Sequence, residues 1–400
     1  MGKNASYRFA MYAIMALAIG IIALKNYQLF SIDLLSNDSD FSSHAIRPYF
    51  FLEDYSYTKE WYNGTSLFMY YPPVSVLIDT FAYFAVGNLG LALALSMLLL
   101  QIMLLWICLQ LARALGRESI DGAFACAVIL SSTISVGRFF NSGRYGEFAG
   151  FVMLFLWILA IAQYLRKPSN RSIAFVFIAS LLASLTHFLE SIILLGFLAI
   201  MGGALIAIKG KMNGRIKNAL AISIAGLAPS ILFWAPFISA SNKPSIVGIA
   251  LSGYILLVGG LLILIAAGLF IIKYRSVASI GIALLLIGYG LGKAAYFPPQ
   301  LGDDFPALEL DGKYFLLRDV PTTAYSVLAA RGFSSPLGNY DPAGDAALIE
   351  KYMEVTTECG SIREFSGYTG SRYVISGKAE LAACGFKAVY SGKFRVYRID

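Results

Sequence analysis

Long apolar runs recur through most of this chain. Between Tyr7 and Ala295, runs of roughly 20 predominantly apolar residues alternate with short polar segments, and a helix of that length crosses the roughly 30 Å hydrocarbon core of a bilayer. Of the 400 residues, 58% are hydrophobic and only 14% are charged. A soluble globular protein does not need so much apolar surface. The sequence therefore predicts an α-helical polytopic membrane protein.

The apolar runs predict about nine transmembrane helices within residues 1–296. The first run is long and has no A-x-A-like site after it, so it is not read as a cleavable signal. A shorter run, 74–87, follows Pro72-Pro73 and carries Asp79 in its middle, which indicates a helix that lies in the outer interface without crossing. The predicted spans are 9–26, 89–112, 119–137, 147–165, 171–187, 189–208, 218–239, 246–272 and 277–296.

Lysine and arginine residues gather near the N-terminus and in four short loops, and such loops stay on the cytoplasmic side. All five groups fall on one side if nine spans cross and 74–87 does not. We therefore expect a multi-pass protein of the cell membrane with a cytoplasmic N-terminus, an outer loop at 27–88 and an extracytoplasmic C-terminal domain. The five groups are Lys3 and Arg8; Arg113 and Arg117; Arg166, Lys167 and Arg171; Lys209, Lys211, Arg215 and Lys217; and Lys273 and Arg275.

The composition changes after Tyr296, and residues 297–400 predict a small soluble α/β domain. Helical spacing at 322–332 and 344–358 precedes three alternating segments, which predict strands with a hairpin at Gly392. The three segments are Arg372–Ile375, Phe386–Ser391 and Lys393–Ile399. A disulfide between Cys359 and Cys384 is compatible with an oxidising compartment, but their spacing does not decide whether it forms.

The net charge of +7 does not indicate a nucleic-acid partner. Its excess lies in the loops predicted to be cytoplasmic, where it sets the orientation and meets anionic membrane lipids. The sequence contains no Walker motif, no glycine-rich phosphate loop and no zinc-like cysteine cluster. Chemistry driven by ATP is therefore not indicated.

The predicted outer face collects both histidines of the chain and several carboxylates. Asp38 and Asp40 lie just after the first span and could supply a general base. His44 shares a face with Asp40 if that segment is helical, and His187 shares one with Glu190 in the same way. Asp38 and Asp40 could alternatively belong to a metal site.

Four short motifs follow one another along the chain in a recognisable order. Asp40 with His44 comes first, then Tyr71-Pro72-Pro73-Val74, then Gly143-Arg144-Tyr145-Gly146-Glu147, then Thr186-His187. In this order they resemble the GT-C superfamily of membrane glycosyltransferases. Within it they look like the membrane proteins labelled "6-pyruvoyl-tetrahydropterin synthase-related". The C-terminal segments around Arg372 and Phe386 also look like the tail of that group.

The resemblance implies transfer of a sugar from a polyprenyl-phosphate donor to a glycan, lipid or protein acceptor on the outer face. Asp40 is the expected general base, with Asp38 as the alternative because Ser39 stands where many relatives have glycine or a second acid, and His44 belongs to the same catalytic motif. The leaving phosphate needs positive charge. Arg138, Arg144 and Lys293 lie near the predicted outer membrane surface and could supply it. The resemblance to the metal-dependent branch of the superfamily also implies a divalent cation, Mg²⁺ or Mn²⁺, held by Asp40, Glu147 and His187. The residues expected to bind substrates are Arg138, Arg144, Lys293, Glu147, His187, Glu190 and Tyr71.

Two other classes of protein remain open from the sequence. One is a transporter or flippase of lipid-linked glycans, and the other is a non-catalytic membrane scaffold whose outer domain binds a partner. The charged groups cluster on one predicted face, and no paired broken helices appear near the midplane, where transporters place their substrate sites. These two features favour the transferase.

Overall fold

The computed structural model describes residues 3–36, 40–54, 57–58, 65–66, 73–187, 214–240, 260–296, 310–317, 354–377, 381–392 and 394–399, together with a few single residues. The chain divides into two units. The bundle unit consists of Met1–Ser31, Pro72–Ser75 and Ala94–Phe297. The mixed unit consists of Ile32–Tyr71, Val76–Leu93 and Pro298–Asp400.

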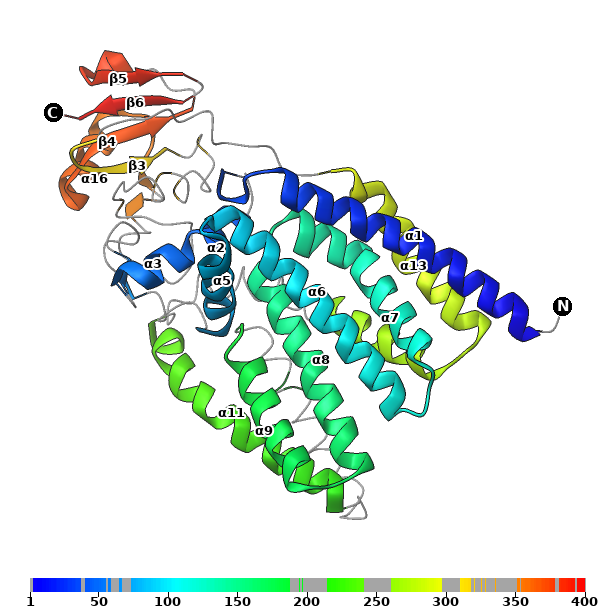
Figure 1. The fold of residues 1–400 in the computed structure, drawn as a ribbon. Coiled ribbons are helices and arrows are strands. Elements are labelled where there is room, and N and C mark those ends of the chain that lie inside the picture. The colour runs from blue at the N-terminus through cyan, green and yellow to red at the C-terminus, as the bar shows by residue number, and fades with distance from the viewer. Residues whose placement is uncertain are drawn as a thin grey trace. The chain divides into compact units, whose positions relative to one another are not determined.

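Helices make up the described part of the bundle unit (Figure 1). Helix α1 packs against α7 and α13, while α8 packs against α9 and α9 against α11. The helices are α1 (Lys3–Ser31), α6 (Leu89–Ala114), α7 (Ser119–Ser131), η2 (Ser135–Asn141), α8 (Tyr145–Arg166), α9 (Asn170–Ser184), α11 (Gly214–Ala240), an unlabelled helix Gly260–Lys273, and α13 (Val277–Ala294).

Four described helices are long and apolar enough to cross a membrane, namely Ser6–Ser31 within α1, and α6, α8 and α13. The bent pair of α7 and η2 makes a fifth if it is counted as one span. Helix α9 and the helix Gly260–Lys273 are apolar but shorter. The predicted run 218–239 lies within α11, whereas 189–208 and the start of 246–272 lie largely outside the described residues. A mostly helical chain with membrane-length helices is thus confirmed, and the number nine stays a prediction.

The predicted span 119–137 is not one straight helix. Helix α7 ends at Ser131, and the π-helix η2 continues at an angle of 66°. Hydroxyl groups explain the break: Ser132 Oγ and Ser135 Oγ both donate to the carbonyl of Ile129, at 2.7 and 2.6 Å. Such side-chain bonds to preceding carbonyls compete with the helical ladder and bend it.

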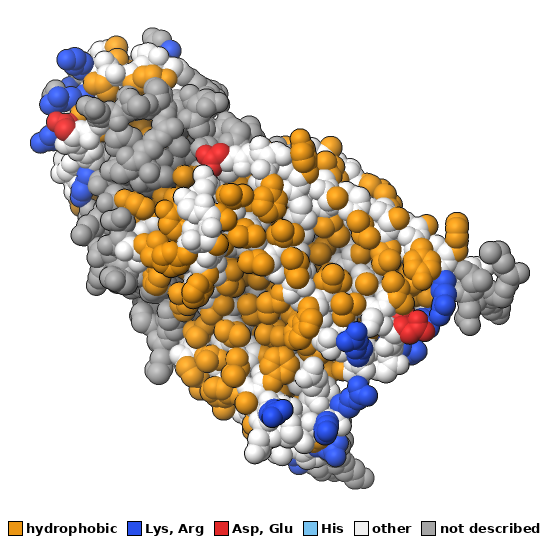
Figure 2. All heavy atoms as spheres, in the orientation of Figure 1, with side chains coloured by type: hydrophobic (Ala, Val, Ile, Leu, Met, Phe, Trp, Pro, Cys, Tyr) orange, Lys and Arg blue, Asp and Glu red, His pale blue; other side chains and the backbone are white. Residues whose placement is uncertain are grey.

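Large apolar side chains face outward along the bundle unit, as the hydrophobic surface in Figure 2 shows. Val277, Leu285 and Phe9 are 86%, 80% and 73% exposed, which suits contact with lipid tails. The helices approach closely where small residues lie between them. A Cβ at Gly290 of α13 would stand 2.4 Å from the carbonyl oxygen of Ser131 in α7, so only glycine allows this contact.

Ion pairs join two of the five basic groups to acids beside a third group, Arg113 and Arg117, at one end of the bundle unit. Arg8 in α1 lies 3.5 Å from Glu118 in the loop between α6 and α7. Arg275, which precedes α13, lies 3.0 Å from Glu118 and 2.8 Å from Asp121. The start of α1, the α6–α7 loop and the segment before α13 therefore meet.

Two further contacts bring the remaining basic groups to the same end. Arg166, in the last turn of α8, donates to the carbonyl of Arg113 at 3.0 Å. Arg215, at the start of α11, donates to the carbonyl of Leu165 at 3.3 Å. Lysine and arginine side chains gather there in Figure 2. The described members of the five basic groups thus share one end, which we call the basic end; the side of a membrane that it faces stays a prediction.

The first outer segment forms small elements of the mixed unit. Ile46 and Phe50 of its helices form an apolar cluster with Val76 of α5. Helix α5 has 14 residues, about 21 Å at 1.5 Å per residue, so it is too short to cross a bilayer, as predicted for 74–87. The elements are η1 (Leu34–Ser36), α2 (Asp40–Ala45), α3 (Arg47–Asp54), β1 (Tyr57–Thr58), β2 (Thr65–Ser66) and α5 (Pro73–Val86).

The C-terminal residues form a four-stranded sheet in the order β3-β4-β6-β5. Strand β3 is parallel to β4, and the other pairs are antiparallel. The three predicted strands and the hairpin at Gly392 are confirmed, whereas β3 and α16 are not predicted and the helices at 322–332 and 344–358 fall mostly outside the described residues. The elements are β3 (Lys313–Leu316), α16 (Cys359–Thr369), β4 (Ser371–Ser376), η4 (Leu381–Cys384), β5 (Lys387–Ser391) and β6 (Arg395–Arg398).

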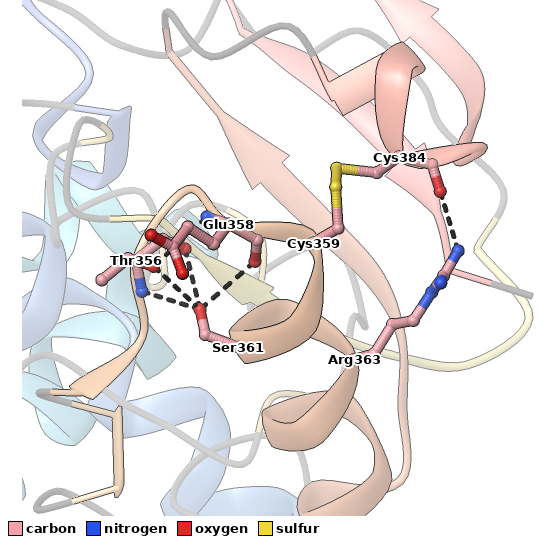
Figure 3. Close-up of a disulfide and its surroundings, with 6 residues drawn as sticks. All are labelled: Thr356, Glu358, Cys359, Ser361, Arg363 and Cys384. Carbon is pink, nitrogen blue, oxygen red and sulfur yellow. Dashed lines mark hydrogen bonds between the residues drawn. A yellow bond between two sulfur atoms is a disulfide. The ribbon is translucent and has the colours of Figure 1, made fainter.

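A disulfide links Cys359, at the start of α16, to Cys384, at the end of η4 (Figure 3). Arg363 reinforces the connection, since its Nη2 donates to the carbonyl of Cys384 at 2.7 Å. The pairing left open by the sequence therefore forms in the structure, and it fastens the helix to the segment that leads into β5.

Candidate active site

A two-point ion pair joins η2 to the start of α8. Arg138 Nη2 lies 2.7 Å from Glu147 Oε1, and Arg138 Nε donates to Glu147 Oε2. The glutamate side chain is only 6% exposed, while that of Arg138 is 34% exposed. Because a buried carboxylate is unfavourable without a partner, Arg138 accounts for the burial of Glu147 and still presents part of its guanidinium outward.

A tight turn between η2 and α8 produces the spacing of the G-R-Y-G-E motif. Gly143 has a φ of 70°, a left-handed conformation that glycine adopts without steric cost. The N–H of Arg144 then donates to the carbonyl of Arg138 at 3.3 Å. The side chain of Arg144 is exposed, whereas Tyr145 and Glu147 are buried. The turn thus lets Arg138 reach the carboxylate of Glu147 and leaves Arg144 exposed.

Lys293, near the end of α13, lies against η2. A Cβ on Gly137 would stand 3.8 Å from Lys293 Nζ and 3.7 Å from its Cδ. Gly137 immediately precedes Arg138, so the Lys293 ammonium lies along the same segment as the guanidinium. Four predicted residues, three cations and one carboxylate, thus belong to η2, to the turn and helix start that follow it, or to the end of α13 beside it: Arg138, Arg144, Glu147 and Lys293. We call this set the η2 cluster.

A buried lysine that the sequence analysis did not single out holds η2 in place. Lys25 of α1 is fully buried, and its Nζ donates to Asn141 Oδ1 at 2.6 Å and to the carbonyl of Tyr296 at 2.5 Å. Asn141 Nδ2 in turn donates to the carbonyl of Lys293 at 3.1 Å. A cation beside the C-terminal carbonyls of α13 is electrostatically favourable. Lys25 is thus a positioning residue for the η2 cluster.

The η2 cluster lies at the end of the bundle unit opposite the basic end. Helix α1 runs from Arg8 at the basic end to Lys25 at the cluster, a distance of roughly 25 Å at about 1.5 Å per residue. This separation is close to the thickness of the hydrocarbon core. The predicted orientation would place the cluster at the extracytoplasmic surface.

Three of the four sequence motifs meet at this end. The N–H of Val74, which follows the two prolines, donates to the carbonyl of Leu185 just before Thr186-His187, at 3.3 Å. The hydroxyl of Tyr145, from the G-R-Y-G-E motif, donates to the carbonyl of Ser75 at 3.2 Å. Residues 73–75 therefore lie between the start of α8 and the end of α9, where His187 is half-buried.

The fourth motif belongs to the mixed unit. Asp40 begins α2 and is half-buried, and His44, four residues later in the same helix, is 8% exposed. The helical spacing expected for this pair is confirmed. Arg47 and Asp79 are also buried in this unit, at 4% and 1% exposure, and neither was proposed as a site residue.

Three predicted site residues, Asp38, Tyr71 and Glu190, lie outside the described residues. Across the described ranges, no group of three or more histidine, cysteine, aspartate or glutamate side chains is arranged to hold a metal ion. Both carboxylate oxygens of Glu147 accept hydrogen bonds from Arg138. Glu147 would have to leave Arg138 before it could bind a cation.

No protein-family model matches the chain, and no curated protein matches it significantly. The class of the protein therefore comes from its structure alone. It is a mostly helical chain with four or five helices that could span a membrane and a small C-terminal sheet. Segments of three sequence motifs meet at one end of its bundle unit.

Proposed function

We propose that this protein is a membrane glycosyltransferase that transfers a sugar from a polyprenyl-phosphate donor to an acceptor hydroxyl on the extracytoplasmic face. The observation that carries the proposal is the convergence of the three motifs beside the η2 cluster. Hydrogen bonds from Val74 and Tyr145 join segments that are far apart in the chain. They do so at the end opposite the basic loops, where the resemblance to the GT-C superfamily would require a substrate site.

The η2 cluster suits a phosphate that gains negative charge as it leaves. Arg138 is half-buried and fixed by Glu147, while Arg144 and Lys293 are exposed. Because Glu147 holds it, Arg138 is a preorganised cation that can stabilise a developing charge without reorganisation at the moment of reaction. Arg144 and Lys293 add positive charge at the same end of the bundle unit. The isoprenoid tail of the donor can remain in the bilayer beside the outward apolar side chains.

The acceptor side of the reaction needs a base. We assign this role to Asp40, with Asp38 as the alternative. In the transfer step the acceptor oxygen forms a bond to C1 of the sugar, and the bond between C1 and the phosphate oxygen breaks with its electron pair going to the phosphate. The acceptor proton passes to the carboxylate. The products are a glycoside and the polyprenyl phosphate.

A divalent cation is not part of this proposal. Glu147 is already occupied by Arg138 through both carboxylate oxygens, so the residues in this arrangement do not fit the set Asp40, Glu147 and His187.

The experiment incubates purified full-length protein with a panel of polyprenyl-phosphate hexoses and with glycolipids and glycoproteins from a deletion strain as acceptors. The proposal predicts release of polyprenyl phosphate together with a labelled acceptor. A flippase would move the donor across vesicles without breaking its sugar–phosphate bond. A scaffold would neither move the donor nor cleave it. A donor that stays intact throughout the panel, whether or not it crosses the vesicle membrane, would overturn the proposal.

A further inference from the structure

A pocket of about 640 Å³ opens at the basic end of the bundle unit, between the last turns of α6 and α8 and the first turn of α9. Four cationic side chains line it, namely Arg113, Arg166, Lys167 and Arg171. We propose that this pocket binds the phosphate group of an anionic phospholipid headgroup. This site is separate from the η2 cluster and does not depend on the proposed transferase activity.

Among the residues that the structure describes, none that lines the pocket carries a carboxylate. Within the described residues, the side chains of Arg113 and Arg166 donate to neutral oxygens, to Ser119 Oγ and to the carbonyl of Arg113, each at 3.0 Å. In the same part of the chain, Lys167 and Arg171 have no side-chain hydrogen bond and no ion pair. Four like charges around one pocket repel one another, and a bound anion would offset that repulsion.

The helix dipole favours a positive charge at the positions of Arg113 and Arg166 but not at that of Arg171. Arg113 and Arg166 lie in the last turns of α6 and α8, where the helix dipole favours a positive charge. Arg171 lies in the first turn of α9, just after its N-cap Ser169, where the dipole disfavours a positive charge and favours an anion. The helix dipole therefore does not stabilise the charge of Arg171, whereas a phosphate bound at the start of α9 would.

The position of the pocket favours a lipid as the source of the phosphate. Helices α6 and α8 are both candidate membrane spans, and both end at the pocket, so it lies at the level expected for headgroups. Basic pockets between membrane helices on the cytoplasmic side recognise anionic headgroups. The amides of Gln110 and Gln163 also line the pocket, with Phe175, and can bond headgroup hydroxyls.

The test measures lipid retention by native mass spectrometry of the full-length protein in detergent, titrated with phosphatidylglycerol or phosphatidylcholine. The proposal predicts saturable retention of phosphatidylglycerol over phosphatidylcholine. The variant Lys167→Gln/Arg171→Gln removes two pocket charges and no described side-chain hydrogen bond. Because each basic residue near an anionic surface contributes about five-fold in affinity, the variant should bind phosphatidylglycerol about 30-fold more weakly.

A matched control removes two charges of the basic end that do not line the pocket, Arg117→Gln/Lys273→Gln. Its affinity should stay within about two-fold of the wild type. Equal losses of affinity in both variants would indicate general charge attraction, and equal retention of both lipids would indicate a nonspecific lipid shell. Either result would overturn the proposal. Displacement of the lipid by millimolar inorganic phosphate would assign the pocket to free phosphate and would also overturn the lipid assignment.

Discussion

Arg138 and Glu147 form a two-point ion pair that joins η2 to the first turn of α8. The pair spans the turn at Gly143 and fixes the arginine at the end of the bundle unit where three sequence motifs meet. The glutamate is the more buried partner. The pair therefore has a structural function, to keep the carboxylate compensated, and in the proposed transferase a chemical one, to hold a cation toward the phosphate.

The first prediction concerns this pair. Arg138→Gln leaves a buried carboxylate without its cation, which should cost about 3 kcal/mol of stability. The double variant Arg138→Gln/Glu147→Gln removes the uncompensated charge and should recover a large part of that loss. Thermal midpoints of the purified protein in detergent would measure both effects. Equal midpoints for the wild type and Arg138→Gln would show that the pair contributes no stability.

The second prediction separates donor binding from stability at Lys293. This side chain is exposed, so Lys293→Gln should leave the thermal midpoint unchanged. Loss of one charged contact to a phosphate, about 1.4 kcal/mol, should raise the KM for the polyprenyl-phosphate donor about ten-fold. Lys273→Gln removes an exposed lysine at the opposite end and serves as the matched control. An unchanged donor KM in Lys293→Gln would remove this lysine from the phosphate site.

The third prediction concerns the disulfide between Cys359 and Cys384, which are 25 residues apart. A loop of that length stabilises the fold by about 3.5 kcal/mol in the chain-entropy estimate. The variant Cys359→Ser/Cys384→Ser should therefore make the C-terminal sheet markedly more sensitive to protease. Dithiothreitol should have the same effect on the wild type and no further effect on the variant.

The number of free thiols gives a second test of the disulfide. Cys108 and Cys126 are free and buried, so thiol labelling of the denatured protein taken directly from cells should modify two cysteines without reductant and four with it. Four labelled thiols without reductant would contradict the expected extracytoplasmic location of this domain.

The fourth prediction is a pH window for the C-terminal sheet. The hydroxyl of Tyr373 donates to Asp311, which lowers the pKa of Asp311 below 3.8 and raises the pKa of Tyr373 above 10.0. The stabilisation of the folded domain by Asp311 is therefore present above pH 3.8, and it is lost as the pH falls through the lower pKa of Asp311 in the native state. The stabilisation of the folded domain by Tyr373 is present below pH 10, and it is lost as the pH rises through the higher pKa of Tyr373 in the native state.

The measurement compares the protease resistance of wild type and Tyr373→Phe across this range. The wild type should be the more resistant at intermediate pH, and the difference should shrink both in strong acid and above pH 10. A difference that does not vary with pH would mean that the hydrogen bond is not the cause.

Hydrophobic length and charge bias predicted the parts of the fold that depend on local sequence. The apolar runs located α1, α6, α8 and α13, and the basic loops do meet at one end through contacts such as that between Arg8 and Glu118. Strands β4, β5 and β6 were predicted because alternation and a glycine turn are local signals. Strand β3 was missed because it is short and its parallel partner β4 lies much later in the chain.

The candidate site was predicted in part. Arg144 and Glu147 came from motif order, and Arg138 and Lys293 from their predicted place near the outer membrane surface. Arg138 contacts Glu147 in the structure, and Lys293 lies against Gly137, the residue before Arg138; their roles in substrate binding stay predictions. The bend after Ser131 and the buried contacts of Lys25 depend on tertiary neighbours, which periodicity does not report. A signal for Lys25 was present all the same, because a lone lysine within an apolar run is costly in a membrane and marks a polar partner.

The most direct measurement of the central claim is the rate of sugar transfer by Asp40→Asn. We expect a loss of at least 100-fold, as follows when a general base is removed, with an unchanged thermal midpoint. Asp33→Asn is the matched control, since Asp33 Oδ1 accepts from the N–H of Leu35 at 3.1 Å in the same segment, and its rate should stay near that of the wild type. Full activity in both Asp40→Asn and Asp38→Asn would contradict the proposed base and the transfer mechanism built on it.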